Sequence, residues 1–127
     1  MLTRHTYLTG MIACTLLLAN PAWAGFEESH QAYSSGDYTT AFKGYLEAAN
    51  GGDSRAYGKV GALYLYGRGI AKDYTQAYVW FGIARDSKDK YAARFQETAA
   101  SMLTREQIEQ AEMALSKKRE ELGIKPE

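Results

Sequence analysis

Residues 37–56 read DYTTAFKGYLEAANGGDSRA, and residues 73–92 read DYTQAYVWFGIARDSKDKYA, so the two stretches align at a constant offset of 36 residues (73 minus 37). Both begin Asp-Tyr-Thr, and alanines and aromatic residues recur at matching positions further along. A period between about 20 and 50 residues indicates a solenoid, in which one unit cannot bury its apolar face alone and stacks on a neighbour. The sequence therefore predicts repeated helical units, whose usual product is a binding surface rather than a reaction.

Residues 1–24 have the features of an export signal. A short basic start is followed by a mostly apolar run, and the small-x-small end Ala22-Trp23-Ala24 predicts cleavage before Gly25. The apolar run is shorter than the roughly 20 residues that span a bilayer, which argues against an uncleaved anchor. Cys14 loosely resembles a lipoprotein signal, but it lies inside the apolar run and does not close it. We therefore expect export to the periplasm, or alternatively secretion.

The remaining chain, from Gly25 to Glu127, has 103 residues (127 minus 24), enough for one small domain. Without Arg4 it carries 14 basic (15 minus 1) and 15 acidic side chains, and it contains no cysteine. We therefore expect stability to come from packing without disulfides. The balanced, scattered charges predict neither a nucleic acid nor an anionic membrane as partner, and no stable membrane insertion once the signal is removed.

Helical periodicity and capping residues divide this domain into consecutive helices. Glycines or capping residues separate them, and no proline falls inside a predicted helix. The predicted helices cover residues 26–35, 38–50, 54–66, 74–85, 92–103 and 105 onward. Asp37, Asp53, Asp73 and Asp89 are predicted caps, and Thr104 and Gln107 form a predicted capping box. We expect repeats over 25–103, then a C-terminal capping helix and tail over 104–127.

The stretch from Ala56 to Ala84 resembles one Sel-one-like repeat (SLR), a relative of the tetratricopeptide repeat. The residues that carry the resemblance are Ala56, Val60, Gly61, Tyr64, Gly67, Gly69, Ile70, Asp73, Ala77, Trp80 and Ala84. Val60 and Ile70 depart from the leucine and valine of the family pattern. Residues 36–52 resemble only the second helix of such a unit, and would suit a tetratricopeptide repeat nearly as well. The resemblance implies an all-α, short right-handed α-solenoid of antiparallel helix pairs, with a scaffold or adaptor role.

The residue types at these positions also have a physical basis in packing. Ala56, Ala77 and Ala84 are small where helices approach closely, and Gly61 allows a still closer approach. Trp80 is expected to fill the space between layers, where a buried aromatic contributes about 2 to 3 kcal/mol. These positions, together with the loop glycines, are therefore predicted to be scaffold and not ligand-binding residues.

The sequence offers little that could support catalysis or a cofactor. His30 is the one histidine after residue 24 and has no cysteine beside it, which argues against zinc, although carboxylates alone could still bind calcium. Ser87 and Lys90 fit Ser-x-x-Lys, but the companion Ser-Asp-Asn and Lys-Thr-Gly elements of the β-lactamase type are missing. We therefore expect no enzyme activity, no cofactor and no metal.

A second stripe on the helix at 54–66 is the candidate partner-binding surface. At 100° per residue, one face of that helix carries Arg55, Lys59, Ala62 and Tyr66. The first helix of each stacked pair lines the concave side, so this stripe is expected to face a groove that binds another protein. The alternatives are a binder of small ligands or peptidoglycan fragments, an accessory subunit of an envelope complex, and ordinary solvated charges with no partner.

Overall fold

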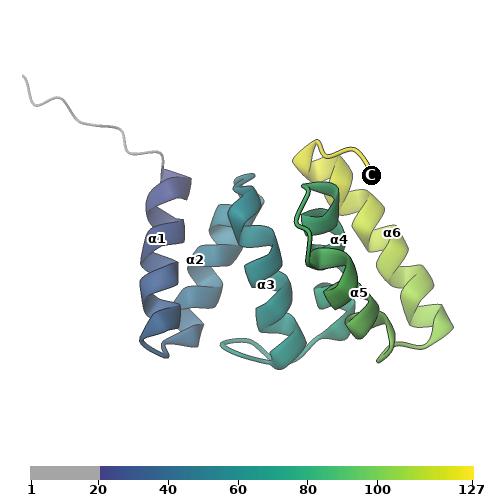
Figure 1. Ribbon diagram of the computed structural model, residues 1–127, viewed down its shortest axis with the longest axis horizontal. Coiled ribbons are helices and arrows are strands. Elements are labelled where there is room, and N and C mark those ends of the chain that lie inside the picture. Colours follow the sequence, from purple (N-terminus) through teal and green to yellow (C-terminus); the bar gives the residue numbers. More distant parts are fainter. Residues whose placement is uncertain (1–20) are drawn as a thin grey trace, which may run out of the picture.

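The computed structural model describes residues 21–127, which form six helices in an array with α1 at one end and α6 at the other (Figure 1). The helices are α1 (Pro21–Ser34), α2 (Tyr38–Asn50), α3 (Ser54–Tyr66), α4 (Tyr74–Asp86), α5 (Ala92–Ala100) and α6 (Arg105–Leu122). This confirms the expected all-α repeat solenoid. The predicted export signal falls largely on residues 1–20, outside the described part of the chain.

Two helix boundaries differ from the prediction by more than one residue. The first helix begins at Pro21 instead of residue 26, because proline suits the first turn of a helix, where its missing N–H has no helical partner. The fifth helix ends at Ala100 instead of Leu103. The chain must become extended at Thr104, which caps α6 with φ −71° and ψ 163°, so the preceding residues form a turn.

Short side chains cap most of the helices as the sequence predicts. The carboxylates of Asp37, Asp53 and Asp73 accept hydrogen bonds from backbone amides in the first turns of α2, α3 and α4. Thr104 and Gln107 form the predicted capping box, with bonds of 3.2 and 2.9 Å. Asp89 is an exception: it accepts from the Tyr91 amide in the turn, and Tyr91 itself is the N-cap of α5.

The loop between α3 and α4 packs against α2, which belongs to the preceding helix pair. Gly69 has φ +73°, and a Cβ at this position would collide with the backbone carbonyl of Tyr38, at the start of α2. Glycine is therefore required at position 69 for two reasons: the left-handed backbone conformation and the close approach to the Tyr38 carbonyl. The contact locks the loop of the second helix pair onto the first pair.

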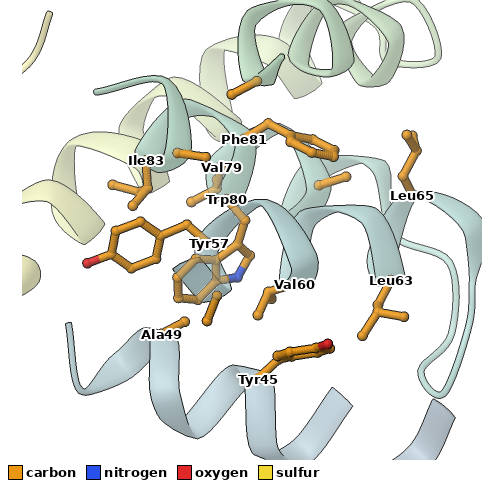
Figure 2. Close-up of a cluster of buried hydrophobic side chains, with 14 of the residues drawn as sticks. Tyr45, Ala49, Tyr57, Val60, Leu63, Leu65, Val79, Trp80, Phe81 and Ile83 are labelled. Carbon is orange, nitrogen blue, oxygen red and sulfur yellow. The ribbon is translucent and has the colours of Figure 1, made fainter. Parts of the chain in front are cut away.

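An aromatic contact joins each pair of successive helices from α1 to α5. Phe26 packs on Tyr45 between α1 and α2, with ring centroids 5.4 Å apart, and Phe42 meets Tyr64 edge-on between α2 and α3. Trp80 of α4 stacks beside Tyr57 of α3 at 6.1 Å, and its indole lies over Ala49 and Tyr45 of α2 (Figure 2). The largest buried side chain thus joins the two helix pairs into one core.

The last helix closes the array by packing across α4 instead of running along α5. Leu115 of α6 lies against Gly82 of α4, where an added Cβ would lie 2.6 Å from a Leu115 methyl group. Beside this apolar contact, Arg119 donates a 2.6 Å hydrogen bond to Asp86, whose side chain is fully buried. The sequence predicts a capping helix, but its position over α4 emerges only in the structure.

A tyrosine hydroxyl adds a third contact between α4 and α6. Tyr78 donates a short hydrogen bond to the Glu112 carboxylate. Burial, followed by this bond and the negative charge of Glu112, raises the pKa of Tyr78 to about 12. The phenol therefore remains protonated and able to donate at any physiological pH.

Candidate partner-binding groove

A pocket of about 230 Å³ lies between α3 and α5, over the side of α4. Its α3 wall carries three of the four residues of the predicted stripe. The residues that line it are Arg55, Gly58, Lys59, Ala62, Phe81, Asp89, Tyr91, Ala92 and Phe95.

Small residues create this hollow, and aromatic rings close its floor. Gly58, Ala62 and Ala92 leave the space between the two helices unfilled. Below them the rings of Phe81 and Phe95 stack with centroids 5.3 Å apart and planes 18° apart. Because Gly61 brings α3 to within contact of the Phe81 ring, the floor is held by the repeat packing itself. The pocket is therefore a fixed feature of the stacked helices.

The charged residues at the rim differ in how far they are already engaged. Arg55 pairs with Asp53 at 2.7 Å and with Glu27 of α1 at 3.4 Å, and its guanidinium lies 4.2 Å from the centre of the Phe26 ring. Arg55 is thus held in place by α1 and by its own helix cap. Lys59 is exposed and forms no ion pair with the described residues. The charge available to a partner on the α3 side is therefore that of Lys59.

The exposed tyrosine at the opposite rim comes from the turn before α5. The Tyr91 side chain is 62% exposed, and the Lys90 ammonium lies 5.0 Å from its ring centre. The Asp89 carboxylate accepts the Tyr91 amide at 2.9 Å and so fixes the backbone of this turn. An exposed aromatic ring on a fixed backbone suits recognition, since little conformational entropy is lost when it is covered.

The structure brings together Arg55, Lys59 and Ala62 but places Tyr66 elsewhere. Tyr66 is the last residue of α3, 55% exposed, and its ring lies near the guanidinium of Arg68, 5.9 Å from its centre. It follows Arg55 by 11 residues (66 minus 55), a distance of about 16 Å along a helix axis. Tyr66 therefore lies beyond the pocket.

Sequence reasoning missed the α5 wall, although the repeat offset contains the signal. Adding 36 residues to Arg55 and Lys59 gives Tyr91 and Phe95, which line the pocket opposite them. Equivalent positions of successive repeats face the same groove, so the stripe could have been carried forward by one repeat.

The residues of the repeat motif lie in the core and in the α3–α4 loop. Ala56, Ala77, Trp80 and Ala84 are at most 2% exposed, Gly61 contacts Phe81, and Tyr64 packs on Phe42. Gly67 ends α3 in the left-handed conformation, Gly69 contacts α2, and Asp73 caps α4.

Metal chemistry and membrane spanning find no support in the described part of the chain. Among residues 21–127, no group of three or more His, Cys, Asp and Glu side chains could hold a metal ion. Within the same range, no helix is long and apolar enough to cross a bilayer.

Comparison with known proteins identifies the fold. No protein-family model and no curated protein matches the chain. Among solved structures, the chain is similar to the crystal structure of c5321, a protective antigen present in uropathogenic Escherichia coli strains that displays an SLR fold. The TM-score is 0.72 with 27% sequence identity over 80% of this chain, which spans only 23% of the length of that protein. The chain is therefore an all-α helical-repeat solenoid of the SLR type.

Proposed function

We propose that this domain is a protein-interaction module that binds a segment of another protein in the groove between α3 and α5. The observation that carries the proposal is the pocket itself, with an apolar aromatic floor and a rim of Lys59 and Tyr91. An apolar anchor surrounded by polar groups is the usual arrangement of a binding hot spot.

The size of the pocket favours a peptide side chain over a free small molecule. Its volume of about 230 Å³ is below the range of about 300–1,000 Å³ typical of small-molecule sites. It suits one apolar side chain of a segment that continues along the groove. The volume therefore argues against the alternative of a peptidoglycan fragment, although an accessory role within an envelope complex uses the same groove.

We also propose that the domain acts by binding alone. The Ser-x-x-Lys residues have other contacts: Ser87 is the C-cap of α4, and the Lys90 ammonium lies over the Tyr91 ring. His30 lies 3.2 Å from the Tyr45 hydroxyl, which places it in the packing between α1 and α2.

Export to the periplasm is part of the proposal and rests on the sequence of residues 1–24. Sequencing the N-terminus of the chain recovered from the cell envelope tests it. We expect a product that begins at Gly25, and recovery of only a Met1 form in the membrane fraction would contradict export with cleavage.

Site-specific photo-crosslinking tests the groove in the native cell. A crosslinking amino acid replaces Tyr91 at the rim, or Met113 of α6, which is 74% exposed and outside the pocket. We expect one discrete protein adduct from position 91 that is absent from position 113. Equal adducts from both positions, or adducts only from 113, would move the binding surface away from the groove.

A further inference from the structure

The turn after α4 differs from the turns that follow four other helices. The turns after α1, α2, α3 and α6 each contain a glycine with positive φ, namely Gly36, Gly52, Gly67 and Gly123. At the equivalent place after α4 the chain has Lys88, with φ +70°, the one non-glycine residue in the left-handed region within 21–127. A side chain there is strained, and strain of this kind persists mostly where the side chain has a function.

The Lys88 side chain lines a second cavity. This cavity has a volume of about 340 Å³ and is lined by three cations, Arg85, Lys88 and Lys90, together with Asp89, Ala93 and Glu127. The Lys88 ammonium lies 3.0 Å from the Glu127 carboxylate. The cavity therefore already contains a carboxylate, provided by the chain itself.

The cavity keeps an excess of positive charge, which comes mainly from Lys88 and Lys90. Arg85 donates a 2.6 Å hydrogen bond to the buried Gln96 and pairs with Asp86 at 3.5 Å, and Asp86 also binds Arg119. One oxygen of Asp89 is occupied by the Tyr91 amide. Without Glu127, three cations and a single carboxylate line the cavity.

The bound carboxylate can be exchanged. The side chains of Lys88 and Glu127 are 74% and 49% exposed, and ion pairs this exposed contribute little to stability and are screened by salt. The Glu127 amide adds a 3.2 Å hydrogen bond to Asp86, which holds the tail beside the cavity without burying it. The C-terminal end of the chain lies next to α4 and α6 (Figure 1).

We propose that the α4–α5 turn is a carboxylate-binding site, occupied by Glu127 in the free protein and taken over by a glutamate or aspartate of an acidic protein segment. Lys88 and Lys90 bind the incoming carboxylate, and Arg85 adds positive charge to the wall of the cavity. This site adjoins the groove pocket, with which it shares Asp89, but its cations are different residues from those that line the groove.

Titration of the full chain with a defined acidic peptide tests the proposal. The probe is acetylated tetraglutamate amide, with tetraglutamine as the neutral control, and the readout is the amide NMR shifts of residues 88–90. We expect Glu127→Gln to bind the probe about threefold tighter than the unchanged chain at low salt, because the internal competitor is removed. Lys88→Gly should bind about threefold more weakly than the unchanged chain at low salt, because one exposed ion pair is lost. Its Tm should be unchanged or raised, because glycine relieves the strained backbone. Lys117→Ala, on an exposed lysine outside the cavity, is the matched control and should bind as the unchanged chain does.

Three results would overturn the proposal. They are equal binding by Lys88→Gly and the unchanged chain, equal binding of tetraglutamine and tetraglutamate, and failure of both the unchanged chain and Glu127→Gln to bind tetraglutamate. A Lys88→Gly variant that gains stability and keeps its binding would show that the strain at Lys88 serves no anion site.

Discussion

Replacing Trp80 with alanine should lower the free energy of unfolding by about 3–5 kcal/mol, a large part of the stability of so small a domain. The side chain is 2% exposed and stacks on Tyr57 of α3. It also lies over Ala49 and Tyr45 of α2, so that its removal opens a cavity between the two helix pairs (Figure 2). Because each pair buries its apolar face on the other, neither can close the cavity alone.

Urea unfolding followed by far-UV circular dichroism measures this loss. Met113→Ala on α6 is the control, since its side chain is 74% exposed and should change the free energy of unfolding by less than about 0.5 kcal/mol. A Trp80→Ala variant as stable as the unchanged protein would mean that the two pairs are not joined through this residue.

The second large effect is expected at Asp86, which binds α6 to α4. Its side chain is fully buried, and it pairs with Arg119, which is 14% exposed, at 2.6 Å. Asp86→Ala leaves the Arg119 guanidinium without this partner and should cost about 3 kcal/mol. Replacing both partners, as in Asp86→Leu with Arg119→Met, should recover much of the loss because no buried charge then remains unpaired. A single variant that costs less than about 1 kcal/mol would show that the other contacts between α4 and α6 hold the helix without this pair.

The same pair predicts how stability depends on pH. Burial by itself raises the pKa of Asp86. The hydrogen bonds from Arg119 and the Glu127 amide, together with the charges of Arg119 and of Arg85 at 3.5 Å, outweigh it and hold the pKa below the ordinary value of 3.8. The pair therefore stabilises the fold above about that pH, and this contribution is lost as the pH falls through the lowered pKa. Acid unfolding should show this component in the unchanged protein and lack it in Asp86→Ala.

Local signals in the sequence were sufficient to predict most of the helices. The bounds of α2 follow from the Asp37 cap and the glycine pair after Asn50, both of which act within a few residues. The position of α6 could not be predicted in this way, because Asp86 and Arg119 are 33 residues apart and either could have been a solvated charge. The unusual backbone of Lys88 could not be predicted either, because the sequence alone does not show which residue after α4 adopts a positive φ.

The groove was predicted only on one side. Periodicity places Arg55, Lys59 and Ala62 on a common stripe, and the structure gathers them at one pocket. Periodicity treats the stripe as endless, however, whereas the pocket is only as long as the overlap of α3 with α5, so Tyr66 falls outside it. The contact of Arg55 with Phe26 joins two helices, and no pattern within one helix contains it.

The affinity of the groove for its protein partner tests the central claim most directly, with Ala62→Leu as the decisive variant. Leucine at position 62 fills the pocket from its α3 wall, whereas Ala114→Leu enlarges another half-buried alanine, on α6 and outside the pocket. Isothermal titration with the partner crosslinked from position 91 should show binding at least about tenfold weaker for Ala62→Leu, or about 1.4 kcal/mol, with Ala114→Leu unchanged. Undiminished affinity in an Ala62→Leu variant that keeps its helicity would contradict the claim that this groove is the binding surface.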